Sequence, residues 1–198
     1  MIYLIRHGET EWSASGQHTG RTDLLPAPAG EAAARGLGDR LRGVTFTHAF
    51  TSPRRRAIET WKLSGMNPAS EIREDLAEWD YGDYEGLTSD QINKQRPGWN
   101  VFADGCPNGE SPADVSARAD RVVEWLRTFD GTVAICSHGH FGRALGARWI
   151  RLPIVDAGRL LLSTASVSIL SYEHDQRDRP AVLLWNEAPS TGSGRPGW

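Results

Sequence analysis

Short apolar stretches of the chain alternate with longer segments in which apolar residues recur every three or four positions. Five apolar stretches are typical of strands buried in a sheet: residues 2–5, 45–51, 132–136, 166–172 and 181–185. Four segments have helical spacing: residues 29–41, 54–63, 111–129 and 141–150. Because strands and helices alternate, the pattern predicts an α/β fold. The expected form is a three-layer sandwich with a central, mostly parallel sheet and helices on both faces.

Three segments show neither the strand pattern nor the helical spacing. Residues 11–28 are rich in Gly, Ser, Thr, Asp and Pro, which predicts a long loop of the kind that often carries function. Residues 75–110 combine aromatic, glycine and carboxylate residues, with helical spacing only at 89–96. We expect this segment to fold over one end of the sheet like a lid. The chain is therefore predicted to form one domain, residues 1–188, followed by a flexible tail, residues 189–198.

Reactive side chains follow three of the predicted strands. The first strand runs into Arg6 and His7. The strand at 132–136 ends just before His138, and the strand at 45–51 ends at Ser52. In α/β folds, ligands bind beyond the carboxyl ends of the parallel strands. The pattern therefore predicts one functional site at this edge of the sheet.

Basic residues near these strand ends indicate an anionic ligand. Arg6 and one of the three arginines at 54–56 offer a planar fork that fits phosphate or carboxylate oxygens, whereas the other two are typical of a solvated helix face. His7 can act as a nucleophile when it is neutral and held by a second hydrogen bond. Gly8 is expected to let the backbone approach the ligand closely. The helix after His138 directs its N-terminal amides to the same place.

Two further features leave alternatives open. His138 and His140 have a spacing found in metal sites. Glu78 or Asp80 could complete such a site, but no third ligand stands at a fitting spacing. Glu78 also lies beside Trp79, and aromatic surroundings favour a carboxyl group that stays protonated and acts as a general acid. Several neighbouring carboxylates fit this description, so the residue pattern alone does not select Glu78.

Composition narrows the range of partners. The 22 basic and 25 acidic residues give a formal net charge of −3, which does not favour nucleic acid. No stretch reaches the roughly 18 apolar residues that span a bilayer, and the start of the chain lacks the pattern of a signal peptide. Cys106 and Cys136 are too few for a disulfide framework. We therefore expect a cytoplasmic protein without a membrane or nucleic-acid partner.

Four motifs, taken together and in this order, carry a resemblance to a known family. They are Arg-His-Gly-Glu-Thr at 6–10, Ser-Pro-Arg-Arg-Arg-Ala at 52–57, Glu-Trp-Asp-Tyr-Gly-Asp-Tyr-Glu-Gly at 78–86 and Ser-His-Gly at 137–139. With them the chain resembles the histidine phosphatase superfamily, which includes the cofactor-dependent phosphoglycerate mutases. The resemblance extends over nearly the whole chain and implies a phosphoglycerate mutase-like fold.

The resemblance also implies a mechanism and a set of site residues. His7 would attack the phosphorus and become a phosphohistidine. Arg6, Arg56 and His138 would hold the phosphoryl oxygens, as positioned cations do in phosphoryl transfer. Glu78 would protonate the leaving alcohol and then activate water, and neither a metal nor a cofactor is implied. The residues implied to contact the phosphate or the substrate are Arg6, Ser13, Gln17, Thr19, Gly20, Arg56, Tyr81, His138 and Gly139.

The resemblance also bears on the choice between two activities. Mutases of the family carry a longer, arginine- and proline-rich insertion, and the stretch between Glu78 and His138 has none. The local motifs resemble instead a subgroup of small acid phosphatases and sedoheptulose-1,7-bisphosphatase-like sugar phosphatases. The sequence thus predicts a metal-independent phosphomonoesterase that acts on small phosphorylated metabolites. A phosphoglycerate mutase and an inactive phosphate-binding protein are the alternatives, and a homodimer is left open.

Overall fold

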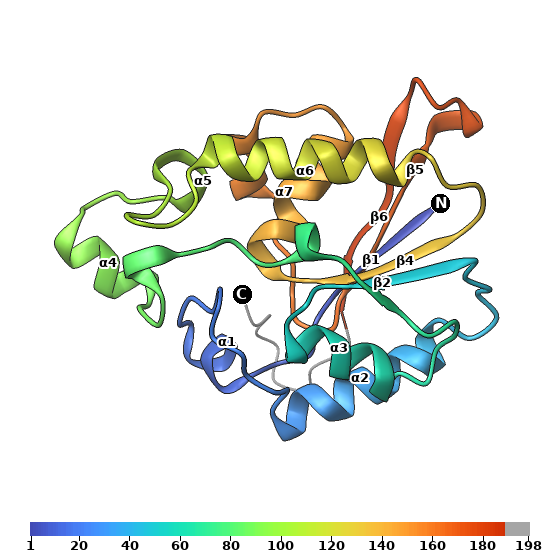
Figure 1. The fold of residues 1–198 in the computed structure, drawn as a ribbon, viewed down its shortest axis with the longest axis horizontal. Coiled ribbons are helices and arrows are strands. Elements are labelled where there is room, and N and C mark those ends of the chain that lie inside the picture. The colour runs from blue at the N-terminus through green and yellow to red at the C-terminus, as the bar shows by residue number, and fades with distance from the viewer. Residues whose placement is uncertain (189–198) are drawn as a thin grey trace.

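The computed structural model describes residues 1–188, and its centre is a sheet of six strands (Figure 1). The strands are β1 (Ile2–Arg6), β2 (His48–Thr51), β3 (Glu71–Ile72), β4 (Val133–Ser137), β5 (Val167–Tyr172) and β6 (Pro180–Glu187). Their order in the sheet is β3-β2-β4-β1-β5-β6. The first four in this order are parallel, whereas β5 is antiparallel to both of its neighbours. The parallel part of the sheet is the part that carries the predicted site residues.

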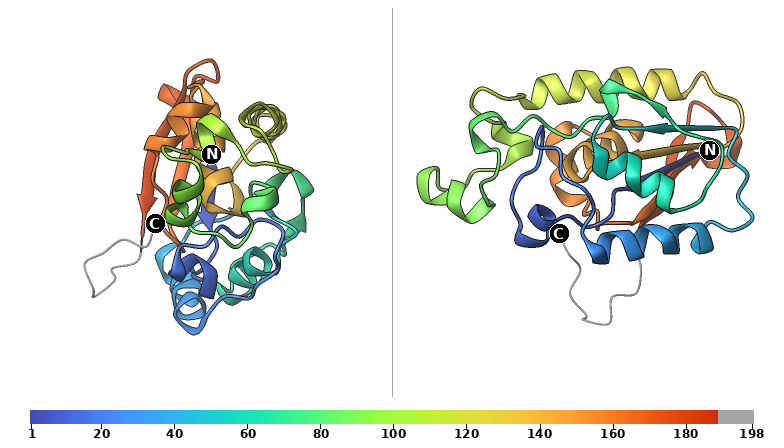
Figure 2. Two further views of the ribbon diagram at one scale, coloured as in Figure 1. Left: turned by 90° about the vertical axis from the view of Figure 1, so that its left-hand side faces the viewer. Right: turned by 60° about the horizontal axis from the view of Figure 1, so that its bottom comes forward.

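Helices cover both faces of the sheet (Figures 1 and 2). The α-helices are α1 (Glu11–Ser15), α2 (Pro28–Arg40), α3 (Arg55–Leu63), α4 (Ser89–Gln95), α5 (Val101–Asp104), α6 (Pro112–Leu126) and α7 (Gly139–Trp149). Short 3-10 helices are η1 (Glu74–Leu76), η2 (Gly82–Tyr84), η3 (Ile154–Arg159) and η4 (Glu173–Asp175). Helices α2 and α3 pack on one face, and α6 and α7 pack on the other. The predicted three-layer α/β architecture is confirmed.

Residues of the central strands alternate between two hydrophobic clusters. In β1, Leu4 packs into the cluster shared with α6 and α7, and Ile5 packs into the cluster shared with α2 and α3. In β4, Ile135 and Cys136 are divided between the clusters in the same way. Because both faces of these strands are covered, their sequences are continuously apolar rather than alternating.

Several boundaries differ from the prediction. Residues 11–28 are not one continuous loop, because Thr10 caps the short helix α1. The Oγ1 of Thr10 accepts from the Ser13 amide, and the Oγ of Ser13 accepts from the Thr10 amide. The predicted helix at 111–129 ends at Leu126, and the predicted strand at 45–51 is ordered as a strand only from His48. Strand β3 was not predicted, since two exposed residues carry no period.

The segment 75–110 lies beyond the carboxyl ends of the parallel strands (Figure 1). Its aromatic residues, among them Trp79, Tyr84 and Phe102, belong to the same hydrophobic cluster as α6 and α7. This segment is therefore part of the main core. The predicted tail at 189–198 lies outside the described residues. None of the helices within residues 1–188 is long and apolar enough to cross a membrane.

Candidate active site

Three adjacent strands bring the predicted residues together. His7 follows β1, Ser52 follows β2 and His138 follows β4, and these three strands are parallel neighbours. The ring centroids of His7 and His138 lie 5.2 Å apart. A cavity of about 310 Å³ opens at this edge, and its lining includes His7, Arg6 and Glu78. The convergence predicted from the strand ends is therefore observed.

His7 is held in the form that a nucleophile requires. Its Nδ1 lies 2.7 Å from the carbonyl oxygen of Gly8. Because a carbonyl only accepts hydrogen bonds, Nδ1 carries the proton of the neutral ring, and Nε2 keeps its lone pair. Burial, reinforced by the nearby Arg56 and Arg6, lowers the pKa of His7 well below its usual value. His7 thus presents an unprotonated Nε2.

His138 is fixed on both sides in its neutral form. The Nε of Arg56 donates to Nδ1 of His138 at 3.2 Å. Since Nδ1 accepts, the ring proton is on Nε2, which donates to the Oγ of Ser52 at 2.6 Å. Burial lowers the pKa of His138 well below its usual value, and Arg56 and His7 add to the effect. Arg56, which can only donate, therefore selects the tautomer of His138, and the Ser52 hydroxyl accepts the resulting Nε2 proton.

Arg56 is the arginine of the 54–56 run that points inward. Its side chain is 0% exposed, whereas Arg55 is exposed. Besides the bond to His138, its guanidinium donates to the carbonyl oxygens of three loop residues, Thr19, Gly20 and Thr22, at 2.8–3.1 Å. Arg56 therefore connects the loop after α1 with the second histidine. The helical position of the arginine, one turn from the strand end, explains why one of the three is buried.

The loop that accepts from Arg56 is held from its other side by Glu85. The Glu85 carboxylate accepts from the amides of Gly20 and Thr22 at 2.9–3.0 Å. The peptide group between Thr19 and Gly20 thus lies between a cation and an anion, because its carbonyl accepts from Arg56 and its amide donates to Glu85. Glu85 stabilises the backbone that fixes Arg56.

Arg6 offers hydrogen-bond donors to an anion. Its Nη1 donates to the carbonyl oxygen of Leu162, and its buried Nε has no protein partner among residues 1–188. Gly139 lies against this guanidinium, and a Cβ at residue 139 would approach the Arg6 Cζ and Nε to 3.4 Å. Even a methyl group at residue 139 would thus be in van der Waals contact with Arg6.

Glu78 lies at the N-terminus of α7. One carboxylate oxygen accepts from the amides of Trp79 at 2.9 Å and Phe141 at 2.7 Å, and the other accepts from the amide of His140 at 3.1 Å. The expectation was that aromatic surroundings would define this carboxyl group. The structure shows instead that three backbone amides orient it, while it still lines the cavity.

The other predicted contact residues are divided by the structure. Ser13, Gln17, Thr19 and Tyr81 line the cavity, together with Gly139. Gly20, Arg56 and His138 do not appear in the described lining and lie behind it.

Three polar side chains of the lining already have protein partners. The Ser13 hydroxyl is bonded to the backbone of Thr10, and the Gln17 amide donates to the carbonyl of Gly86. The Tyr81 hydroxyl lies 2.6 Å from Nδ1 of His140. Direct contacts from Ser13 and Gln17 to a phosphate therefore stay predictions.

One sequence-based interpretation was wrong in its reason. Gly8 was expected to make room for a ligand, but a Cβ there would collide with the backbone of Gly30 in α2, so the glycine serves helix packing. The metal alternative finds no support in the described part of the chain, where no three His, Cys, Asp or Glu side chains form a ligand group. In addition, Nδ1 of His138 already accepts from the cation Arg56.

Three polar side chains of the segment 75–110 pack the fold and do not line the cavity. The Nε1 of Trp79 donates to the carbonyl of Glu110, and that of Trp99 donates to the carbonyl of Gly105. The Asn108 side chain bonds to Asp83 on the surface. His18, by contrast, lines the cavity beside Tyr81, with ring centroids 4.8 Å apart.

Sequence reasoning missed some residues of the site. Ser52 was recognised only as a strand end, and its bond to His138 depends on two strands meeting. Arg143 of α7 lines the cavity, while its Nε and Nη2 donate to the carbonyls of Ala157 and Gly158. Its position one turn into the helix after His138 was the available signal.

The largely buried histidines predict acid sensitivity of the fold. Burial lowers the pKa values of His7, His138 and His140 well below the usual value, and it lowers that of His18 as well. In the unfolded chain the pKa of each of these groups is about 6.5. Below that pH the unfolded state binds more protons than the folded state. The free energy of unfolding is therefore highest above that pH and decreases as the pH falls. We expect the free energy of unfolding to decrease by about 1 kcal/mol per pH unit for each such histidine.

Urea titrations between about pH 7.5 and pH 5 measure this dependence. The His140→Asn variant removes one of the four groups and should make the dependence shallower. A free energy of unfolding that stays constant over this range would contradict the prediction.

Comparison with known proteins agrees with the motifs. A family model described as histidine phosphatase superfamily (branch 1) matches residues 2–188. An acid phosphatase of Mycobacterium tuberculosis is 43% identical, and the match covers 98% of this chain and 97% of the relative. Sedoheptulose 1,7-bisphosphatase of Saccharomyces cerevisiae is 30% identical, with 91% and 90% covered.

Solved structures show the same fold. The structure of the product of an open reading frame of Mycobacterium tuberculosis superimposes with a TM-score of 0.89 at 39% identity, covering 94% of this chain and 97% of that chain. The predicted phosphoglycerate mutase-like α/β fold and the predicted class, a phosphoric monoester hydrolase, are confirmed. The chain belongs to the histidine phosphatase superfamily.

Proposed function

We propose that this chain hydrolyses phosphate esters of small metabolites, without a metal, through a phosphohistidine at His7. The observation that carries the proposal is the neutral His7 ring. Its Nδ1–H donates a hydrogen bond to the Gly8 carbonyl, and its Nε2 is free in a cavity that Arg6 and Glu78 also line. A buried neutral imidazole with one fixed hydrogen bond is an activated nucleophile.

The first step transfers the phosphoryl group to His7. The Nε2 lone pair forms a bond to phosphorus as the bond from phosphorus to the ester oxygen breaks. Glu78 donates a proton to that oxygen, so the alcohol leaves neutral. The positive charge of Arg6 and Arg56 stabilises the phosphoryl oxygens in the transition state, and His138 lies beside the reacting ring.

The second step returns the enzyme to its starting state. The Glu78 carboxylate takes a proton from water as the water oxygen attacks the phosphorus. The bond from phosphorus to Nε2 breaks, phosphate leaves, and His7 is neutral again. Both steps use the same carboxyl group, first as an acid and then as a base.

The cavity supports a small substrate. A volume of about 310 Å³ is at the lower end for ligand sites. Its polar lining includes His18, Gln17 and Arg143, which can bind hydroxyl or acidic groups of the alcohol portion. The homodimer and the cytoplasmic location stay predictions from the sequence.

A panel of phosphorylated metabolites tests the proposal. We expect release of inorganic phosphate from sugar phosphates or phosphoglycerate-like acids, unchanged by a chelator. Phosphoglycerate should not isomerise, whether or not bisphosphoglycerate is present. Isomerisation without phosphate release would favour the mutase, activity lost with chelator would favour a metallohydrolase, and no turnover of any ester would indicate an inactive phosphate-binding protein.

A further inference from the structure

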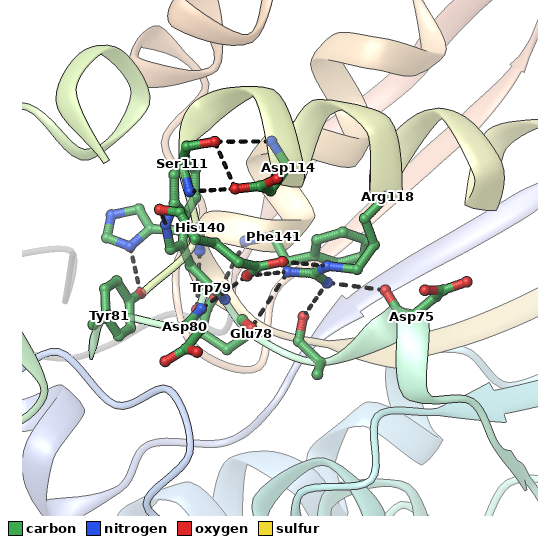
Figure 3. A network of polar contacts seen from close by, with 12 residues as sticks. Asp75, Glu78, Trp79, Asp80, Tyr81, Ser111, Asp114, Arg118, His140 and Phe141 are labelled. Carbon is green, nitrogen blue, oxygen red and sulfur yellow. Dashed lines mark hydrogen bonds and ion pairs between the residues drawn. The ribbon is translucent and has the colours of Figure 1, made fainter. Parts of the chain in front are cut away.

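A buried arginine outside the four motifs holds the segment that carries Glu78. Arg118 lies on the inner face of α6, one turn from Val115 and Val122, and is 8% exposed. A buried charge is costly unless it is paired and hydrogen-bonded. The contacts of Arg118 therefore indicate what the residue is for (Figure 3).

The guanidinium of Arg118 donates hydrogen bonds to the backbone of residues 75–78 and to the carboxylate of Glu110. Its Nη1 donates to the carbonyls of Asp75 at 3.0 Å and Ala77 at 2.7 Å. Its Nε and Nη2 donate to the two oxygens of Glu110 at 2.9 and 2.7 Å, and Nη2 lies 3.4 Å from the carbonyl of Glu78. All five N–H groups of an arginine are engaged in this way. The planar fork of arginine suits this arrangement, whereas the three donors of lysine do not.

Glu110 continues the support past Glu78. Its carboxylate accepts from the amide of Asp80 at 2.9 Å, and its own amide donates to the Asp80 carbonyl at 2.9 Å. Its carbonyl accepts from Nε1 of Trp79. The ion pair of Arg118 and Glu110 thus fixes the backbone before, at and after Glu78.

The same arginine contacts the helix end that receives the Glu78 carboxylate. The Arg118 Cζ lies 4.2 Å from the centroid of the Phe141 ring. The amide of Phe141 is one of the donors to Glu78. Arg118 therefore touches both the backbone that carries the carboxyl group and the helix turn that orients it (Figure 3).

We propose that Arg118, paired with Glu110, is a positioning residue that sets the Glu78 carboxyl group at the ester oxygen of the substrate. This inference rests on the proposed role of Glu78 as acid and base. A displacement of even about 1 Å can cost a factor of about 10² in rate. The arginine itself does not contact the substrate, and it is absent from the described cavity lining.

Leaving groups separate positioning of Glu78 from a general loss of structure. An alkyl phosphate such as glycerol phosphate needs protonation of its alcohol, whereas p-nitrophenyl phosphate releases a stable phenolate without an acid. We expect Arg118→Lys to lower kcat/KM for glycerol phosphate by about 10²-fold. For p-nitrophenyl phosphate, kcat/KM should fall less than about 3-fold. A burst of p-nitrophenolate should appear, because hydrolysis of the phosphohistidine also needs Glu78.

Arg121→Lys is the matched control. Arg121 lies on the same helix and pairs with the exposed Asp75 side chain. Its substitution should therefore leave kcat/KM unchanged for both substrates. Glu110→Gln, which keeps the shape of the partner, should shift the same ratio by a smaller factor. If the Arg118→Lys variant does not fold, Glu110→Gln becomes the decisive variant.

Equal losses for both substrates, or no loss, would overturn the positioning role. Glu78→Gln tests the underlying function separately. If Glu78→Gln itself shows no selective loss on glycerol phosphate, the acid role in the proposed function fails. If Glu78→Gln shows the loss and the variants at Arg118 and Glu110 do not, only the positioning inference fails.

Discussion

Replacing His7 by alanine is expected to lower kcat/KM by at least about 10³-fold, because the variant has no nucleophile to accept the phosphoryl group. The loss should be similar for p-nitrophenyl phosphate and for metabolite esters, since the quality of the leaving group does not replace an attacking nitrogen. Steady-state kinetics measure the loss. Denaturation of the wild-type protein in alkali during turnover of labelled substrate should trap a phosphohistidine, and His7→Ala should trap none.

His174→Asn is the control for the loss of a histidine. His174 is exposed in η4 and has a positive φ of 49°, a conformation that asparagine tolerates. This variant should keep full activity and the trapped intermediate. Activity retained by His7→Ala, or label found on another residue, would contradict the proposed mechanism.

Replacing Arg56 by alanine should lower kcat/KM by about 10²- to 10³-fold, because the variant loses a positive charge near His7 and the donor that fixes His138. The fold should suffer as well, because the carbonyls of Thr19, Gly20 and Thr22 lose their donor. An unsatisfied buried acceptor costs about 1–3 kcal/mol. Since Arg56 also lowers the pKa of His7, the acid limb of the kcat/KM profile should move to higher pH in the variant.

Kinetics as a function of pH, vanadate binding and urea titration measure these effects. Arg56→Lys should recover part of the stability and little of the activity, because lysine cannot reproduce the four directed hydrogen bonds. Arg55→Ala, at the neighbouring exposed position, should behave as wild type. A larger loss of activity in Arg55→Ala than in Arg56→Ala would contradict the role proposed for Arg56.

The strand ends were the most predictable part of the site. Strand propensity and burial on both faces are properties of a few consecutive residues, so the stretch before His7 and that before His138 could be recognised in isolation. Parallel pairing then required their carboxyl ends to meet. The choice of Arg56 among three arginines came from the resemblance alone, since each position is compatible with a helix.

Boundaries and caps were less predictable. The helix α1 depends on a reciprocal bond between Thr10 and Ser13, which the surrounding Gly and Ser residues concealed. Strand β3 exists because β2 offers it a neighbour, as Phe50 pairs with Glu71. Arg118 could have been noticed, because an arginine at helical spacing between Val115 and Val122 interrupts an apolar face.

The sequence by itself determined the α/β class, the family and the residue types gathered at the carboxyl ends of the strands. Those properties follow from local periodicity and from motifs of adjacent residues. Only the tertiary structure decided which nitrogen of His7 and of His138 carries the proton, and what holds Glu78. Those answers depend on partners far apart in the chain, such as Arg56 for His138 and Arg118 for Glu78. A hydrogen bond of this kind forms only where packing brings donor and acceptor within about 3 Å, which no local pattern specifies.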